Sequence, residues 1–201
     1  MKKLMIAVAA LALTATSVHA QRPLPGAAAP KTWVSVYGLM YTSLSGLRDP
    51  DSESRWAFDD SAWGFGASLH RQVGTGLMLG LDGSFARPAY ERQLESSDVT
   101  HSGTATIATA MATGRFSYGG ASEVGLYLTG GVGSVLYHLE DLESWNADLA
   151  LQAGTGLEYR FHPRRALALE WGRTWGYHEK EGLGGGSQQH SVLKLALRLG
   201  F

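Results

Sequence analysis

Hydrophobic and polar residues alternate along most of the chain after residue 31. The clearest example is the C-terminal stretch 191–201, which reads SVLKLALRLGF. One set of alternate positions is Leu193, Leu195, Leu197, Leu199 and Phe201, and the other is Lys194, Ala196, Arg198 and Gly200. A period of two is typical of a β-strand whose two faces meet different surroundings. An uncovered apolar strand would aggregate in water, so this face needs a protein cover or a solvent other than water.

The same alternation predicts eight strands, each long enough to cross a membrane at a tilt, which takes ~9–11 residues. Their ranges are 34–44, 63–70, 77–85, 104–118, 124–132, 149–161, 167–177 and 193–201. The pattern leaves open which face of 34–44 and of 104–118 points inward. In the other strands, the more polar and glycine-rich positions are expected to face the interior.

The connections between these strands alternate in length. Short turns are expected at 71–75, 119–122 and 162–165, and long polar loops at 45–61, 86–103, 138–148 and 178–189. An even strand number with alternating short and long connections is typical of outer-membrane barrels. The predicted fold class is therefore all-β, an eight-stranded antiparallel up-and-down transmembrane β-barrel. The alternative is a soluble lipocalin-like barrel, in which the apolar residues point inward around a ligand.

The N-terminus indicates export. Residues 1–20 have two lysines, a short apolar core and the small-x-small sequence Val18-His19-Ala20, the pattern of a cleaved signal peptide. The apolar core is shorter than the ~20 residues that span a bilayer. Residues 21–31 are rich in proline and alanine and are expected to form a short periplasmic leader, so the barrel domain is 32–201. The chain has no cysteine, which excludes disulfides.

An eight-stranded barrel is just wide enough for side chains to fill it. The inward positions carry three acids and three bases, namely Asp82, Glu158, Glu170, Arg160, Lys194 and Arg198. Because buried charges persist when they are paired, we expect an interior salt-bridge network. It should be centred on Glu170, with Lys194 or Arg198 from the neighbouring strand. The alternative use of these charges is an ion or proton path.

Arg173 breaks the outward apolar pattern between Trp171 and Trp175. An outward Arg costs ~2–4 kcal/mol at the bilayer midplane and almost nothing at the interface. Counting from the turn at Arg165 places Arg173 near the outer rim, where it could contact lipopolysaccharide. The competing interpretation is a β-bulge that turns the side chain inward. Aromatic residues at other strand ends fit interfacial girdles: Phe116, Tyr118, Tyr159, Phe161 and Phe201 at one rim, Trp175 and Tyr177 at the other.

The four long loops hold 14 of the 18 acidic residues and five basic ones. This acidic end could bind divalent cations or cationic partners, or it could simply keep the rim soluble. Four aromatic residues, Trp56, Phe58, Tyr90 and Trp145, lie in these polar loops. They could contact a partner or pack against the strand tips.

Two segments resemble the OmpX/Ail outer-membrane proteins and the related OmpA barrel. They are LQAGTGLEYRFHPRRALALEWGRTW (151–175) and LYLTGGVGSVLYHLE (126–140). The terminal pattern of Leu195, Leu197, Leu199 and Phe201 is similar to the signal that such barrels offer to the barrel-assembly machinery. The resemblance implies an outer-membrane barrel of a Gram-negative cell. It also implies a role in adhesion, resistance to host defence or envelope integrity.

The sequence does not favour catalysis. Barrels that deacylate lipid A use Ser, His and an acid, but His101-Ser102 and His190-Ser191 are adjacent pairs whose side chains point to opposite faces of a strand. No metal or cofactor is expected, and a net charge of −1 speaks against a nucleic-acid partner. The prediction is a monomeric, non-enzymatic barrel that contacts outer-membrane lipid, the barrel-assembly machinery and, through its loops, host or surface proteins. The alternatives are a lipid-A-modifying enzyme and a barrel for passage of small hydrophobic molecules.

Overall fold

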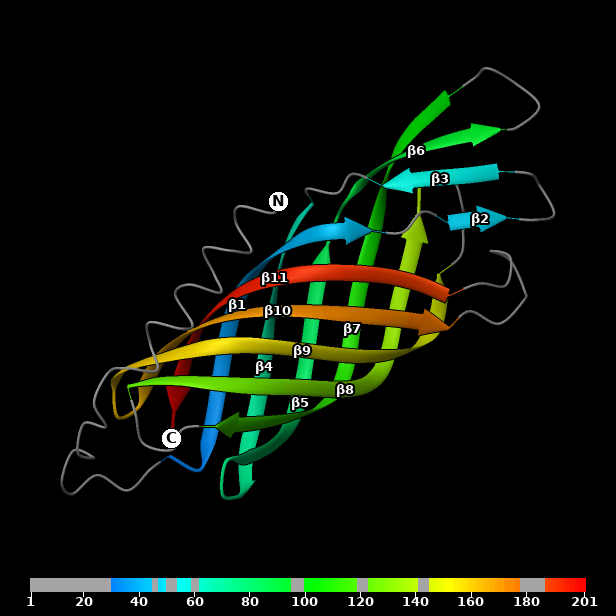
Figure 1. Ribbon diagram of the computed structural model, residues 1–201. Helices are drawn as coiled ribbons and strands as arrows, with labels where there is room; N and C mark the ends of the chain where they lie inside the picture. Colours follow the sequence, from blue (N-terminus) through cyan, green and yellow to red (C-terminus); the bar gives the residue numbers. More distant parts are fainter. Residues whose placement is uncertain are drawn as a thin grey trace.

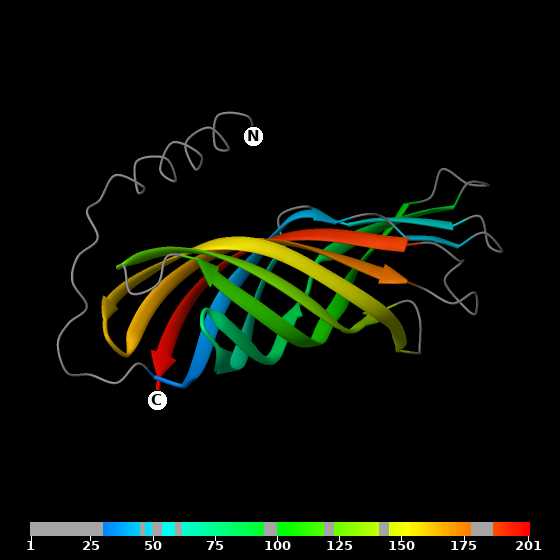
Figure 2. The ribbon, with the colours of Figure 1, turned by 60° about the horizontal axis from the view of Figure 1, so that its bottom comes forward.

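The computed structural model describes residues 30–44, 47–49, 54–58, 62–94, 100–118, 123–140, 145–177 and 187–201. Within them, eight long antiparallel strands form a closed barrel (Figures 1 and 2). These are β1 (Thr32–Leu44), β4 (Trp63–Gly74), β5 (Leu77–Ala86), β7 (Thr100–Tyr118), β8 (Val124–Leu139), β9 (Asn146–His162), β10 (Arg165–Tyr177) and β11 (Ser187–Gly200). Each strand pairs with the next in this series, and β11 pairs with β1. The predicted fold class is confirmed.

The two ends of the barrel differ. At one end, which we call the turn end, β4 and β5 are joined by Thr75–Gly76, and β9 and β10 by Pro163–Arg164. Gly76 has a φ of 72°, a left-handed conformation that glycine adopts without steric cost. At the opposite loop end the chain makes the long connections. The predicted signal peptide and most of the leader lie outside the described residues, and no helix among the described residues is long and apolar enough to span a bilayer.

The C-terminal strand β11 shows on which side of the barrel wall the apolar residues lie. Leu195 is 61% exposed and Phe201 69%, whereas Lys194 is 7% and Arg198 1% exposed. The leucines therefore lie on the outer wall and the cations in the interior, the reverse of a soluble barrel. Backbone pairing on both edges of every barrel strand leaves no open sheet edge in the wall, as hydrocarbon surroundings require.

The structure settles the facing of the first and fourth predicted strands. In β1, Trp33, Tyr37 and Tyr41 point inward, and the valines between Trp33 and Tyr37 point outward. In β7, Ile107, Met111 and Arg115 are buried inside the barrel, and the outward positions between them are mostly alanine. Small residues on the outer face and mixed residues on the inner face gave the sequence pattern too little contrast to assign these strands.

Two of the predicted long loops, 45–61 and 86–103, contain further strands, so the prediction of loops there was wrong. The additional strands are β2 (Leu47–Asp49), β3 (Ser54–Phe58) and β6 (Ala89–Leu94). β6 continues β5 along the same partner strand, because Ala86 pairs with Ile107 and Ala89 with Thr104. Pro88 lies between them, and its carbonyl accepts a hydrogen bond from the Ala105 N–H at 2.9 Å. A proline followed by charged residues resembles a loop in the sequence, which is why the strand was missed.

β2, β3, β6 and the Thr100–Thr104 part of β7 form a four-stranded sheet at the loop end, which we call the outer sheet. Figure 1 shows it extending beyond the barrel on the side away from the short turns. A small cluster supports it, in which Tyr90, Ala105 and Leu139 are buried and Phe58 packs edge-on against Tyr90 at 6.3 Å between ring centroids. The fourth predicted strand therefore begins at Thr100 rather than at 104.

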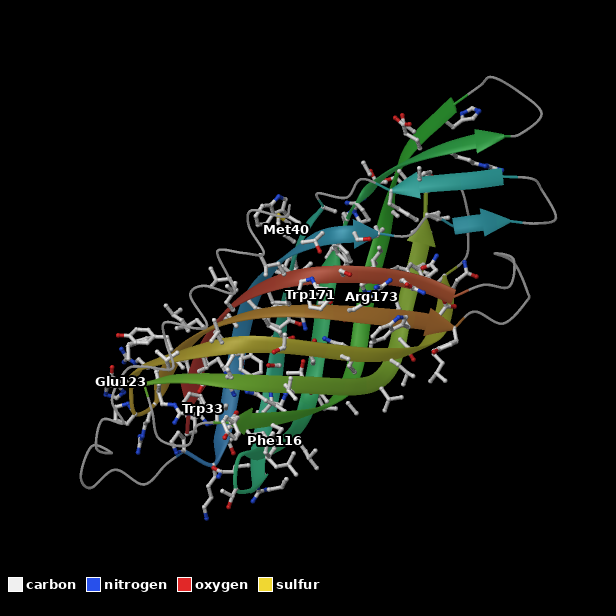
Figure 3. All side chains as sticks on the ribbon, viewed as in Figure 1. Trp33, Met40, Phe116, Glu123, Trp171 and Arg173 are labelled. Carbon is white, nitrogen blue, oxygen red and sulfur yellow. The ribbon has the colours of Figure 1, made fainter. Side chains whose placement is uncertain are left out.

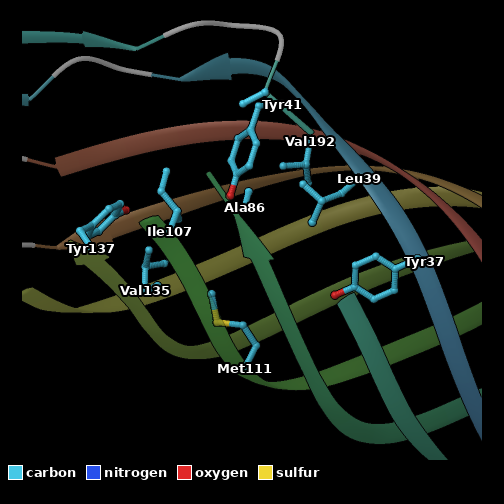
Figure 4. Packing of buried hydrophobic residues seen from close by; sticks show 11 residues of the cluster. Tyr37, Leu39, Tyr41, Ala86, Ile107, Met111, Val135, Tyr137 and Val192 are labelled. Carbon is cyan, nitrogen blue, oxygen red and sulfur yellow. The ribbon is translucent and has the colours of Figure 1, made fainter. Parts of the chain in front are cut away.

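An apolar layer fills the interior toward the loop end (Figure 4). It consists of Tyr37, Leu39, Tyr41, Ala62, Ala86, Ile107, Met111, Val135, Tyr137, Ala150 and Val192. Along β11, Val192 lies nearer the loop end than Lys194 and Arg198, so the six predicted inward charges lie on the turn side of this layer. The buried Asp148 lies on its loop side, beyond Ala150 on β9. The interior is thus divided into an apolar layer and a charged layer.

Three inward tyrosines lie directly opposite glycines of a neighbouring strand. The pairs are Tyr37 with Gly66, Tyr127 with Gly156, and Tyr90 with Gly103. A Cβ at any of these glycines would collide with the tyrosine ring. Glycine is needed at these positions because the rings occupy the space that a side chain would fill.

Replacing Gly156 with Ala should destabilise the barrel by ~1–3 kcal/mol, the cost of overpacking a filled interior. The added methyl would collide with the Tyr127 ring and lie 2.6 Å from the Leu169 carbonyl oxygen. Urea unfolding of the barrel in lipid vesicles, followed by tryptophan fluorescence, measures this cost. Gly38→Ala is the matched control, because a Cβ there meets nothing within 4 Å. Equal stability of the two variants would contradict the proposed packing role of Gly156.

Candidate functional site

The charged layer contains a cluster around Glu158 of β9. One carboxylate oxygen of Glu158 accepts hydrogen bonds from Arg198 of β11 and, at 2.7 Å, from Arg115 of β7. The other oxygen accepts one from Arg160 at 2.7 Å. The side chains of Glu158, Arg115 and Arg198 are 6%, 5% and 2% exposed, and that of Arg160, nearer the turn end, is 29% exposed. One acid thus binds three cations from three strands.

A second cluster surrounds Lys194 of β11. Its Nζ lies 3.3 Å from Oδ1 of Asp82 and 3.5 Å from Oε1 of Glu170. The Tyr37 hydroxyl donates to the same Asp82 oxygen at 2.8 Å, and the Lys194 ammonium lies 4.9 Å from the centre of the Tyr37 ring. One cation is therefore shared by two acids, and the net negative charge of this cluster offsets part of the net positive charge of the cluster around Glu158.

The structure places all six predicted interior charges inside the barrel and shows where the predicted arrangement differs. Glu170 is beside Lys194, its cross-strand partner, but Arg198 binds Glu158 instead. Glu158 therefore has more partners than Glu170. Arg115 was missed because the facing of 104–118 was open. Arg115 lies on the same face of β7 as Ile107, and only the structure shows that this face is buried.

Aromatic rings hold the buried arginines from the sides. The Arg115 guanidinium carbon lies 3.4 Å from the centre of the Tyr127 ring, and that of Arg198 lies 5.0 Å from the Trp33 ring. Arg198 also donates to the Met78 sulfur at 3.6 Å. Ring stacking adds to charge pairing for a weakly hydrated guanidinium. The arginines are therefore fixed in a tightly packed layer. This geometry suits a structural role in which side chains fill the barrel.

The interior cavity between the two clusters is small. Its volume is about 40 Å³, and its lining includes Ser35, Ser68, His70 and Thr129 as well as charged groups from both clusters. A cavity of this size holds only a few water molecules. His70 is hydrogen-bonded to Thr113 at 3.0 Å across it. Among the described residues, no three His, Cys, Asp or Glu side chains are grouped so that they could hold a metal ion.

Arg173 remains on the outer wall. The pairing of β10 with β9 and with β11 is regular from Ala166 to Tyr177, so the competing interpretation of a bulge is wrong. The Arg173 Nη2 donates to Oε1 of Gln189 on β11. Figure 3 shows Arg173 and Trp171 next to each other on β10.

The four loop aromatics are in different environments. Tyr90 is 2% exposed and Phe58 packs against it, so the Tyr90 side chain is not available to a partner. Trp145 is 56% exposed and stacks on His138 of β8 with ring centroids 5.1 Å apart. The side chain of Trp56 lies outside the described residues.

The two His-Ser pairs do not form a nucleophilic dyad. His190 is buried inside the barrel, where its ring lies 5.3 Å from that of Tyr41. The adjacent Ser191 takes the alternate face of β11 and is also buried, at 8% exposed. His101 and Ser102 are adjacent and both exposed near the end of β7. The arrangement needed for acyl transfer, with a base within hydrogen-bond reach of the hydroxyl, is absent from these two pairs.

The last residues close the barrel at the turn end. Leu195, Leu197, Leu199 and Phe201 all face outward. The Phe201 carbonyl accepts hydrogen bonds from the N–H groups of Lys31 at 3.1 Å and Thr32 at 3.3 Å, and the Phe201 N–H donates to the Thr32 carbonyl at 2.8 Å. The chain end is therefore paired with the start of β1.

Replacing Glu158 with Gln should destabilise the barrel by ~3–5 kcal/mol, because it leaves buried cations without their counter-charge. The midpoint of urea unfolding in vesicles, or the temperature at which the heat-resistant gel band disappears, measures the effect. Glu140→Gln is the control. Glu140 pairs with Arg87 at the exposed loop end, where such a pair contributes less than ~1 kcal/mol. If both variants lost the same stability, the Glu158 cluster would stabilise the barrel no more than an exposed ion pair does.

Comparisons with known proteins agree with this architecture. The Neisserial surface protein A has 14% sequence identity and a TM-score of 0.59, covering 87% of this chain and 100% of its own. OprG from Pseudomonas aeruginosa has 9% identity and a TM-score of 0.57, covering 86% and 98%. Ail from Yersinia pestis has 17% identity and a TM-score of 0.44, covering 86% and 100%.

The likenesses to Neisserial surface protein A and to OprG are at the level of the fold, and a comparison with curated protein sequences finds no match. A family model provides the stronger result. It describes the outer membrane protein beta-barrel domain and matches residues 8–198. The chain therefore belongs to the family of outer-membrane β-barrel proteins.

Proposed function

We propose that this protein is a non-enzymatic barrel of the Gram-negative outer membrane that presents its outer sheet as an interaction surface outside the cell. The observation that carries the proposal is that two barrel strands continue beyond the length that a membrane requires. β5 continues as β6, and β7 continues alongside it. β7 alone has 19 residues, against ~9–11 for a tilted membrane strand. Loops at the end opposite the short turns are extracellular in this class of barrel, so the extra length projects from the cell.

The outer sheet is connected to the barrel by the continuation of β5 and β7 and by polar contacts at its base. Arg87 forms a salt bridge with Glu140 at 3.3 Å, from the junction of β5 and β6 to the end of β8. Glu140 also accepts a hydrogen bond from the Thr104 N–H at 3.1 Å, so it ties β7 to the same point. With the buried Tyr90 beneath it, the sheet is a preformed surface, and a partner would not need to order it on binding.

The charge of this end supports a partner with cationic groups. The long loops hold 14 of the 18 acidic residues in the chain. Opposite charges steer association and select partners more than they raise affinity. The outer sheet itself carries Asp49 and Glu91 against Arg48, Arg55 and Arg92, so most of the acids belong to the loop segments between its strands and to the other two loops. A protein with basic segments, on a host or on another cell surface, would be attracted to this acidic end as a whole. A divalent cation could also bridge the acids to neighbouring sugars.

The alternative functions have less support. Passage of small hydrophobic molecules along the axis is opposed by the apolar layer and by an interior cavity of only about 40 Å³. Lipid-A modification is opposed by the opposite facing of His190 and Ser191. The same closed interior opposes an ion or proton path through the charged layer.

The proposal includes export and assembly. Residues 1–20 would be removed as a signal peptide, and the outward Leu195, Leu197, Leu199 and Phe201 would be the signal for the barrel-assembly machinery. The pairing of Phe201 with Lys31 and Thr32 supports this, because recognition of the last strand would precede its closure on β1. The barrel alone accounts for closure of the sheet, so we propose a monomer.

A truncation tests the proposed surface. Replacing residues 89–104 with Asn-Gly joins Pro88 to Ala105, which are already hydrogen-bonded, through a two-residue hairpin turn. It also removes the partner strand of β3 and so dismantles the outer sheet. Cells with this variant should lose most of their binding to immobilised matrix and serum proteins, while the barrel keeps its heat-resistant gel mobility.

Arg164→Gln is the control for this experiment, since Arg164 is an exposed residue at the turn end. Cells carrying it should bind as well as cells with the unchanged protein. If the truncated protein assembles normally and the cells bind unchanged, the outer sheet is not the interaction surface. A role in envelope structure would then be the better account.

A further inference from the structure

The outer wall of β11 and β1 changes from apolar to polar between two neighbouring rows of paired residues, whereas on β10 the aromatic Trp175 follows Arg173 and pairs with Leu151 of β9. The first row is Trp171, Leu193 and Met40, which are paired across the three strands and continue to Trp63 on β4. The next outward row toward the loop end is Arg173, Ser191 and Ser43. Trp171 is 48% and Trp63 70% exposed. Because tryptophan collects at membrane interfaces, the first row marks the outer edge of the hydrocarbon layer.

Arg173 points from this edge toward the cell surface. Its hydrogen-bond acceptor, Gln189, is the cross-strand partner of Trp175, one outward position closer to the loop end. The guanidinium carbon lies 5.9 Å from the centre of the Trp175 ring, on the same side. Arginines near an interface extend in this way, so that the stem stays in the apolar layer and the charge reaches the headgroups.

The charge of Arg173 has capacity for a further ligand. A guanidinium carries five N–H donors, and the described residues provide one acceptor, Gln189. Among the described residues, no carboxylate lies within salt-bridge distance of Arg173. Within the part of the chain that the structure describes, the group is held in place by a neutral amide and an aromatic ring, and neither compensates its positive charge.

We propose that Arg173, oriented by Gln189, binds the phosphate group of a phosphorylated lipid of the outer leaflet. The planar guanidinium matches two phosphate oxygens at once, which an ammonium cannot do. Trp171 and Trp175, the outward positions on either side of it on β10, place it in the interfacial region where tryptophans collect. The site would anchor one lipid against β10 and β11 and orient the barrel relative to the membrane surface.

Native mass spectrometry of the full protein, purified from membranes in detergent, tests this with diphosphorylated lipid A as the probe. Arg173→Gln should bind this lipid about tenfold more weakly than the unchanged protein, the effect of losing a charge-assisted, two-point contact. Arg165→Gln is the matched control, because Arg165 starts the same strand at the turn end and is also exposed. It should bind within roughly twofold of the unchanged protein, as expected for removal of a surface charge.

Two further arms distinguish the source of the phosphate. Lipid A from which both phosphates have been removed should bind the unchanged protein about tenfold more weakly than diphosphorylated lipid A does, and this comparison involves no variant. Inorganic phosphate at the same concentration should not displace the lipid. Displacement would show a site for free anions and would overturn the lipid proposal. Equal losses in Arg173→Gln and Arg165→Gln, or equal binding of the two lipids, would overturn it as well.

Discussion

Backbone hydrogen bonding in a medium without water is the constraint on which this structure depends. In hydrocarbon every N–H and C=O must find a partner within the protein, and a sheet can meet this demand only when it has no free edge. The pairing of β11 with β1 removes the last edge, and Phe201 is bonded to the start of β1. The apolar residues are then free to face outward, because the solvent on that side is lipid.

Closure with eight strands leaves a narrow interior, and the contents of that interior follow from its width. Polar side chains that would face water in a soluble protein are enclosed, so their charges must be paired. The anion Glu158 pairs with three arginines, and the cation Lys194 pairs with two acids. In both clusters the partners come from more than one strand. Where large rings enter, as at Tyr37 and Tyr127, the opposite strand has glycine. Packing and charge pairing together make the barrel a closed wall with a filled interior.

The constraint ends at the membrane surface, and there the chain behaves differently. β5 and β7 continue past the barrel, with Pro88 at the junction, and support the short strands of the outer sheet. On the outer wall, the row containing Arg173 marks the same boundary, since a cation is tolerated where headgroups replace hydrocarbon. Both proposals, a surface for partners and a site for a lipid phosphate, therefore concern the part of the protein that leaves the apolar layer.

The alternation of residues was sufficient to predict the barrel, its eight strands and the outward leucines of β11, because a period of two and the demands of lipid allow few other solutions. In the strands where apolar and polar residues alternate clearly, the sequence also determined which charged residues lie inside. It could not reveal Arg115, the pairing of Arg198 with Glu158, or β6 beyond Pro88. Those depend on which strands are neighbours and in what register, and residues far apart in the chain meet only when the sheet closes. Tertiary structure alone therefore decided the partners of each charge and the form of the outer end.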